Sequence, residues 1–265
     1  MEQRWHVGTW MVPSYDHELN LIYIGTSVTS PAPKYLIGGV GNKHLYHNST
    51  LAIDADTGRI VWYYQHVVDH WDLDHPFECM LVDTAVAPAA KDVLWINPKI
   101  KPGERRKVLT GIPGKTGIVY TLDRETGQFL WARETTEQNV IENLNVESGA
   151  ATVNRDMLFT APGQEKLVCP ATRGGKNYPA GAYSPLTGLM YFPLENTCMK
   201  ATSGAGQSLD DLYAFRNVVQ LTPGTDNVGR IEAISASTGA TTWHMEQRAG
   251  TLSLLTTGGG LLFGG

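Results

Sequence analysis

Three aspartates within six residues form the chemically most suggestive feature of the sequence. Asp69, Asp72 and Asp74 directly follow a strand-like segment, and His70 and Trp71 lie among them. A carboxylate cluster at the end of a regular strand pair is where a β scaffold would present a metal ion or a catalytic base. A polar surface loop is the alternative that these residues leave open on their own.

Composition limits the class of protein. The chain has 265 residues, 42% of them hydrophobic, with a net charge of −5 and scattered Lys and Arg, so nothing points to nucleic acid. No apolar run approaches the roughly 18 residues of a membrane span, and the polar, aromatic start does not read as a signal peptide. The contents of Gly, Trp and Tyr, which number 28, 7 and 11, are typical of a turn-rich β protein.

The three cysteines have no metal or redox spacing. No CxxC pair is present, which excludes zinc-ribbon, thioredoxin-like and c-type haem sites. One disulfide and one free thiol remain open for an oxidising compartment.

An internal repeat surrounds the aspartates. Each of its three best copies has a Gly followed four residues later by a Trp. These copies are Ile53-Asp54-Ala55-Asp56-Thr57-Gly58 before Trp62, Leu122-Asp123-Arg124-Glu125-Thr126-Gly127 before Trp131, and Ile234-Ser235-Ala236-Ser237-Thr238-Gly239 before Trp243. Looser copies run over 15–20 and 183–188.

Each copy predicts a hairpin. The Asp or Ser starts the turn by bonding to the backbone, and the Gly, or Asn20 in the first copy, adopts a positive φ. The Trp would then pack on a neighbouring sheet. A repeat of this length suits four-stranded blades, so we expect an all-β propeller of about four to five blades.

The remaining segments fit this interpretation. Short β-rich stretches at 20–26, 117–122 and 188–193 predict strands, and the C-terminal 256–265 predicts a turn and a strand. Loops are expected at 31–48, 87–107, 134–149 and 199–230, and the best helix candidate is 208–217. We expect one partial propeller domain over 1–265.

With these repeats and motifs, the chain resembles the PQQ-dependent (quinoprotein) alcohol dehydrogenases, which are eight-bladed propellers that include methanol and ethanol dehydrogenases. The resemblance rests on the repeats, Trp10 with Tyr15-Asp16, Gly25-Thr26 with Pro31-Ala32-Pro33, Trp71-Asp72-Leu73-Asp74, Lys115-Thr116-Gly117, and Cys169 with Cys198. It implies the central to C-terminal portion of such an enzyme. The quinone-capping disulfide and a metal-ligating glutamate would lie outside these residues, so the portion alone is expected to be inactive.

The resemblance also implies site residues. Asp72 matches the catalytic aspartate, which takes the alcohol proton as hydride moves to PQQ, with Trp71 wedging the loop. Trp10 would be the aromatic floor under PQQ, Lys115 would hold its quinone oxygens, and Asn177 would contact it. The alternatives are a packing Trp, a turn aspartate, a loop lysine and a turn asparagine. Asp69 is expected to be structural.

A metal ion is implied beside PQQ. Asp72 and Asp74 would bind it, and the second carboxylate resembles that of lanthanide-using members, although calcium would also accept it. Asp74 as a salt-bridge or loop residue is the alternative. The family's asparagine before Pro-Ala-Pro is absent, so Ser30 or Thr29 would have to offer an oxygen. This substitution puts metal identity in question.

Two further features follow from the resemblance. Cys169 and Cys198 correspond to a family disulfide, which leaves Cys79 free. A family tryptophan expected near 248–251 is absent, so that PQQ contact would be altered.

The implied function is oxidation of an alcohol to an aldehyde or ketone in the periplasm, with electrons passed to a cytochrome c-type acceptor. The alternative is a non-catalytic propeller that acts as a binding scaffold. Self-association or a second chain would complete the ring of blades.

Overall fold

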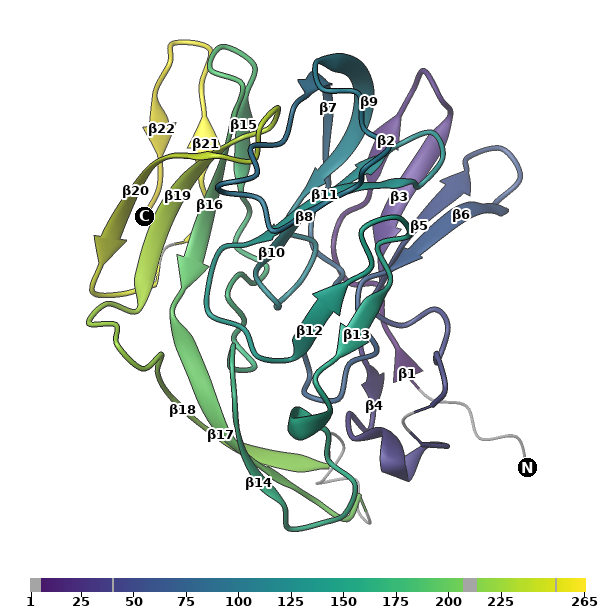
Figure 1. Ribbon diagram of the computed structural model, residues 1–265, viewed down its shortest axis with the longest axis vertical. Coiled ribbons are helices and arrows are strands. Elements are labelled where there is room, and N and C mark those ends of the chain that lie inside the picture. Colours follow the sequence, from purple (N-terminus) through teal and green to yellow (C-terminus); the bar gives the residue numbers. More distant parts are fainter. Residues whose placement is uncertain (1–5, 40, 207–213, 251) are drawn as a thin grey trace.

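In the computed structural model, three large antiparallel sheets stand side by side as the segments of a fan (Figure 1). The structure describes residues 6–39, 41–206, 214–250 and 252–265. The strand orders are β2-β3-β5-β6, β7-β9-β10-β11-β8 and β15-β16-β19-β20. The strands of the first and third sheets pair in chain order, as expected for a propeller blade. The second sheet has the same order from β7 to β11, except that the short β8 pairs at the outer edge of β11.

The strands of the three blades are short. The first blade contains β2 Ser14–Asp16, β3 Leu21–Gly25, β5 Ser49–Asp54 and β6 Ile60–Gln65. The second contains β7 Met80–Val86, β8 Trp95–Ile96, β9 Glu104–Gly111, β10 Ile118–Asp123 and β11 Phe129–Glu134. The third contains β15 Ala182–Ser184, β16 Leu189–Glu195, β19 Gly229–Ser235 and β20 Thr241–Gln247.

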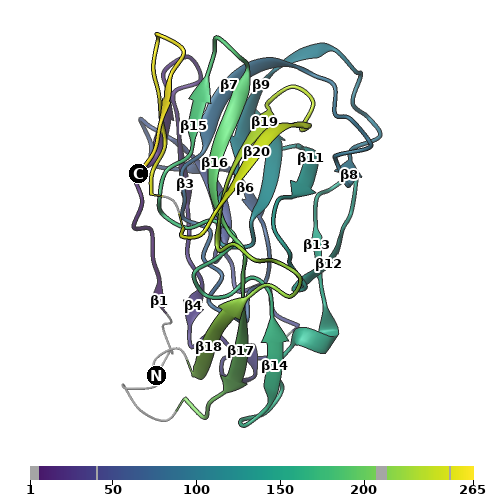
Figure 2. The ribbon, with the colours of Figure 1, turned by 90° about the vertical axis from the view of Figure 1, so that its left-hand side faces the viewer.

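Smaller sheets extend the fan. β21 Leu255–Thr256 and β22 Leu262–Phe263 lie beside β15 and begin a further blade. The opposite end of the molecule carries β14 Glu165–Val168, β17 Thr197–Ser203 and β18 Phe215–Leu221, with the pair β1 His6–Val7 and β4 Thr29–Ser30 (Figure 2). The remaining elements are β12 Ile141–Leu144, β13 Ala151–Val153 and two 3-10 turns, η1 Lys34–Leu36 and η2 Arg155–Met157.

The all-β propeller fold is confirmed. Three complete blades and the start of another, among the described residues, match the lower end of the four to five predicted. The predicted strands at 20–26, 117–122 and 188–193 correspond to β3, β10 and β16. The Cys169–Cys198 disulfide is present and Cys79 is free.

Three predicted loops and the helix candidate were wrong in part. The loop predicted at 199–230 contains most of β17 and all of β18, that at 134–149 contains β12, and that at 87–107 contains β8 and the start of β9. The helix candidate 208–217 lies mostly outside the described residues, but its last three residues belong to β18. β-branched Val218 and Val219 carry that strand onward, because pairing with β17 outweighs a weak helical pattern.

The repeated turns have the predicted chemistry. Oδ1 of Asp54 accepts hydrogen bonds from the backbone N–H and the hydroxyl of Thr57, both at 2.7 Å. Asp123 and Thr126 make the same pair of bonds in the second blade. The turn glycines Gly58 and Gly127 have φ values of 70° and 73°, which only glycine adopts without strain.

Each repeat tryptophan occupies the same place in its blade. Trp62, Trp131 and Trp243 face an Ala or Thr on the partner strand, just before a register shift in the hairpin. The rings of the first two lie over the turn glycine of the following blade. A Cβ on Gly127 would stand 2.7 Å from the Trp62 ring, and one on Gly239 would stand 3.0 Å from the Trp131 ring. Buried apolar clusters accordingly fill the seams between consecutive blades.

A further turn of this type escaped the sequence analysis. Oδ1 of Asn145 accepts bonds from Glu147 and Ser148, and Gly149 has a φ of 74°. Tyr64 takes the place of the tryptophan, because its hydroxyl donates to the Gly149 carbonyl at 2.6 Å. The Asn-x-x-Ser-Gly pattern was the available signal.

We expect Gly127→Ala to destabilise the fold by about 2–4 kcal/mol, because the methyl group meets both a positive φ and the Trp62 ring. Gly58→Ala is the matched control: it has the same φ but no atom within 4 Å of the new Cβ, so we expect a cost of about 1 kcal/mol. Urea unfolding measures both. Equal losses would contradict the docking role of Gly127.

Candidate active site

Three loops from successive blades meet at one place. The aspartate loop (residues 66–79) connects β6 to β7, the lysine loop (residues 112–117) connects β9 to β10, and the asparagine loop (residues 169–181) leads into β15. Backbone bonds join them in series: the Lys115 N–H donates to the Asp74 carbonyl, and the Gly175 N–H donates to the Lys115 carbonyl, both at 2.8 Å. The predicted residues on these loops are therefore brought together.

Asp69 builds the aspartate loop. Its two carboxylate oxygens accept the backbone N–H groups of Trp71 and Leu73, each at 3.1 Å, and the side chain is fully buried. These bonds curl the chain so that Asp72 adopts a φ of 63°, a left-handed value uncommon for aspartate. Trp71 is also fully buried and its indole N–H donates to the Met157 carbonyl at 2.9 Å. Both residues have the structural roles expected from the sequence.

Asp72 and Asp74 share one lysine. The Lys115 ammonium lies 2.7 Å from Oδ2 of Asp74 and 3.5 Å from Oδ2 of Asp72, and it also donates to the Asp72 carbonyl at 3.0 Å. All three side chains are largely buried, with 11%, 17% and 8% of the surface of Asp74, Asp72 and Lys115 exposed. Little water reaches these charges, so their mutual interaction is strong.

The charges alter the acidities in this cluster. Burial raises the pKa of Asp72 to about 7; the nearby Lys115 opposes this rise, whereas the carboxylates of Asp74 and Asp69 add to it. Burial also raises the pKa of Asp69 to about 6, against the effect of Lys34. The pKa of Lys115 is raised, because Asp72 and Asp74 together outweigh the opposing effect of its burial.

The metal ligands predicted from the sequence are only partly assembled. Oδ1 of Asp74 accepts the Val28 N–H at 3.0 Å, which places the segment that leads to Ser30 beside the aspartate loop. Ser30 is buried, but its side chain takes no part in the bonded cluster of Asp72, Asp74 and Lys115. The Thr29 hydroxyl lies 3.4 Å from the His47 ring. No group of three or more His, Cys, Asp or Glu suited to a metal occurs in the described part of the chain.

Trp10 and Asn177 lie further from the carboxylates. Trp10 is 48% exposed and packs edge-on against Phe77 of the aspartate loop, with ring centres 5.6 Å apart. The Asn177 amide donates to the Arg173 carbonyl and its oxygen accepts the Tyr178 N–H, both at 2.8 Å. Its side chain therefore bonds within its own turn, which is the alternative weighed for it in the sequence.

A groove of about 530 Å³ runs beside Asn177. Ala249 and Gly250 are among the residues that line it, at the place where the resemblance led us to expect a tryptophan. Small residues therefore line the groove where an indole ring was expected.

Two buried lysines near the site were missed. Lys176 pairs with Glu78 at 2.9 Å and ties the asparagine loop to the aspartate loop. Lys34 is fully buried and donates to the Ala32 carbonyl at 2.7 Å; burial lowers its pKa to about 8. Neither lysine stands in a motif, so only the three-dimensional packing identifies them.

Comparison with known proteins identifies relatives of similar sequence. The quinone-dependent alcohol dehydrogenase subunit of Komagataeibacter europaeus is 32% identical over 199 residues, covering 74% of this chain and 25% of that protein. A lanthanide-dependent methanol dehydrogenase of Methylacidiphilum fumariolicum (strain SolV) is 29% identical over 276 residues, covering 99% of this chain and 42% of the relative. The chain thus spans less than half the length of these relatives.

A solved structure has the same fold. A europium-containing methanol dehydrogenase superposes with a TM-score of 0.82 at 28% identity, covering 96% of this chain and 42% of that one. No helix in the described residues is long and apolar enough to cross a membrane.

Residues 1–143 match the family described as PQQ: Glucose/ethanol/alcohol dehydrogenase, beta-propeller domain. Because this match covers more than half of the 265 residues, the chain belongs to the β-propeller family of PQQ-dependent glucose, ethanol and alcohol dehydrogenases.

Proposed function

We propose that this chain carries the base-bearing half of the active site of a PQQ-dependent alcohol dehydrogenase. Asp72 removes the hydroxyl proton of an alcohol, which becomes an aldehyde or ketone. The proposal rests on one observation above the others: Lys115 is held between the buried carboxylates of Asp72 and Asp74. A non-catalytic scaffold has no need of such a cluster, because buried charges cost stability.

The acidity of Asp72 suits a general base. A base works best when its pKa lies near the working pH, and burial brings the pKa of Asp72 to about 7. Lys115 keeps that value from rising further. Its ammonium would also stabilise negative charge that develops beside Asp72 during proton removal.

The residues present fit PQQ. Trp10 offers an exposed ring to a planar ligand, and its edge contact with Phe77 keeps that ring beside the aspartate loop. Lys115 would hold the quinone oxygens, and Asn177 would contact the cofactor from the groove next to it. When bound, PQQ would supply the oxidant that takes a hydride, which is one proton with two electrons, from the alcohol carbon.

A hard cation fits as part of the same site. Asp72 and Asp74 supply carboxylate oxygens, the donors preferred by calcium and by trivalent lanthanides, and Ser30 is our candidate for a further oxygen. Calcium takes about six to eight oxygens, so other groups must supply the rest. We propose that residues outside this chain do so.

The proposal extends to the surroundings of the enzyme. We place it in the periplasm, where the Cys169–Cys198 disulfide would persist, with a cytochrome c-type protein as electron acceptor. The blades needed to complete the ring would come from a longer polypeptide, a second chain or a second copy.

Cofactor binding tests the roles of Trp10 and Asp74. Adding PQQ with calcium or lanthanum to the protein should quench tryptophan fluorescence, because Trp10 would stack on the quinone. Asp74→Asn should weaken binding about tenfold or more with lanthanum and less with calcium, since a trivalent ion gains more from the second carboxylate. Binding is the readout because the chain spans 42% of the lanthanide-dependent relative.

Glu142→Gln, which neutralises an exposed carboxylate of β12, is the matched control and should leave PQQ binding unchanged. If PQQ fails to bind with either metal to an intact-length propeller that contains these residues, the enzyme proposal is wrong and the scaffold alternative takes its place.

The acidity of Asp72 depends on the neighbouring ammonium of Lys115. Lys115→Met should raise the pKa of Asp72 above about 7, because the opposing positive charge is removed. The folded pKa of Asp72 lies above the ordinary aspartate value of 3.8, so protonated Asp72 stabilises the fold below about pH 4, and this contribution is lost as pH rises through about 7. In Lys115→Met that loss moves to higher pH.

Titration of the ¹³C carboxyl resonance, assigned with Asp72→Asn, measures this shift. Lys176→Met is the control, because Lys176 pairs with Glu78 and should leave the titration of Asp72 in place. A lower pKa in Lys115→Met would contradict the assigned electrostatics.

A further inference from the structure

His75 is fully buried where the aspartate loop meets the lysine loop. Its imidazole has a partner at each nitrogen: Nδ1 lies 2.8 Å from the Leu73 carbonyl oxygen, and Nε2 lies 3.2 Å from the Thr116 hydroxyl. Leu73 stands between Asp72 and Asp74, and Thr116 directly follows Lys115. One ring therefore joins the backbone that carries the two carboxylates to the residue next to the ammonium.

The partners of His75 determine its tautomer. A carbonyl oxygen only accepts, so Nδ1 must carry the proton and donate it to Leu73. Nε2 is then unprotonated and accepts the hydrogen of the Thr116 hydroxyl. One rigid ring thus bonds Leu73 at one nitrogen and Thr116 at the other. The imidazole therefore sets the distance between the aspartate loop and the lysine loop at this point.

Two glycines hold the backbone around this ring in close contact. A Cβ on Gly114 of the lysine loop would lie 2.3 Å from Cγ of His75 and 2.5 Å from the Asp74 carbonyl oxygen. On the other side, a Cβ on Gly25 would lie 2.3 Å from the His75 carbonyl oxygen. The ring therefore has no room to shift toward the lysine loop, and the His75 backbone is packed tightly against β3.

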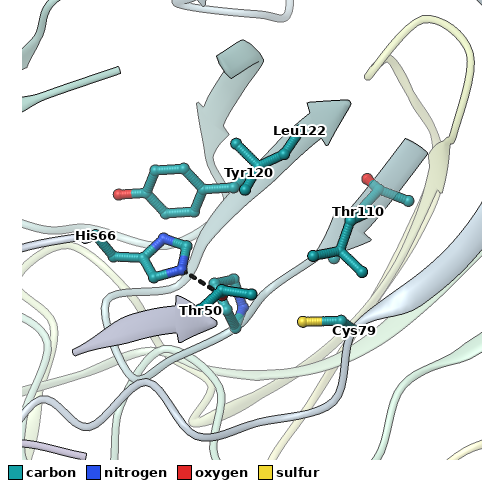
Figure 3. Close-up of a pocket in the computed structure, with 9 residues that line it drawn as sticks. Thr50, His66, Cys79, Thr110, Tyr120 and Leu122 are labelled. Carbon is teal, nitrogen blue, oxygen red and sulfur yellow. Dashed lines mark hydrogen bonds between the residues drawn. The ribbon is translucent and has the colours of Figure 1, made fainter. Parts of the chain in front are cut away.

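The imidazole of His66 stacks against the imidazole of His75. His66 lies parallel to His75, with ring centres 5.0 Å apart and an angle of 13° between the planes. Figure 3 shows His66 bonded to the Thr50 hydroxyl, with Tyr120 across its ring; the distances are 2.8 Å for that bond and 4.6 Å between the ring centres. Through this stack, the blade seam supports the position of His75.

We propose that His75 is a positioning residue for the active site: by bonding Leu73 and Thr116 it fixes Lys115 between Asp72 and Asp74. Its role in turnover rests on the proposed function, but the placement of Lys115 does not. His75 touches none of the three charged side chains through its hydrogen bonds, so its influence passes through the two loops.

A double-mutant cycle on the 265-residue chain tests the placement. His75→Phe keeps an aromatic ring over His66 but removes both hydrogen bonds. If His75 positions Lys115, the Lys115 contacts are already weakened in His75→Phe. The factor by which Lys115→Met changes the unfolding equilibrium constant should then be at least about fivefold smaller in the His75→Phe background than in the parent protein. Urea unfolding measures both factors.

Lys176→Met is the matched control, because it removes another buried lysine that binds the same aspartate loop through Glu78. Its effect should combine with that of His75→Phe within about twofold, as independent sites do. His75→Asn should restore part of the coupling to Lys115, since its amide nitrogen can replace Nδ1 as a donor to Leu73. Equal effects of Lys115→Met in both backgrounds would overturn the proposal.

If His75→Phe does not fold, the tautomer of His75 in the unsubstituted protein tests the proposal instead. Nitrogen-15 spectra of the imidazole should show the proton on Nδ1 of His75, and a proton on Nε2 would overturn the proposal. Neither measurement uses PQQ, so a failure to bind the cofactor would refute the proposed function and leave this result in place.

Discussion

The packing of a tryptophan ring over a glycine of the next turn is the constraint on which the rest of this structure depends. Trp62 on Gly127 and Trp131 on Gly239 set the spacing of consecutive blades, because no side chain separates the ring from the backbone. The fully buried Trp131 fills the seam between the second and third blades. A blade is a twisted sheet with two faces to cover, and this repeated contact packs the face of one blade against the next.

The candidate site is a product of that spacing. Asp72, Lys115 and Asn177 belong to loops of successive blades and have no common secondary structure. Their arrangement is fixed by backbone bonds from loop to loop and by glycines that admit close approach, such as Gly174 against the Lys115 backbone. A small change in the angle between blades would therefore separate charges that need to stay within hydrogen-bonding distance of one another.

Much of the fold could be predicted from the sequence, because its signals are local. A turn that begins with Asp54 and ends with Gly58 leaves a pattern in five adjacent residues, and Trp62 follows four positions after the Gly. The Asn145 turn is covered by Tyr64, which lies 85 residues before Gly149, so its aromatic partner left no adjacent signal. β18 was missed for the same reason, because its pairing with β17 is a tertiary contact that outweighs a local preference.

The site divides in the same way. Asp72, Asp74 and Lys115 were found through motifs, but their sharing of one ammonium is a contact between residues 41 and more positions apart. His75, Lys34 and Lys176 look like ordinary loop residues in the sequence, since nothing in their neighbours states that they are buried. The metal prediction named Asp72, Asp74 and Ser30, and of these only the two aspartates meet, at the Lys115 ammonium.

The burial of the Lys115 pairs has a consequence for the environments in which such a protein can work. Dissolved salt weakens attraction between exposed charges, with a screening length of about 10 Å at 0.1 M. Ions have little access to charges that are 3.5 Å apart or closer and have 17% or less of their surface exposed. Surface pairs such as Lys99–Glu147, each more than 60% exposed, lack this shelter. The charge balance of the cluster is thus insulated from the salinity of the surrounding fluid.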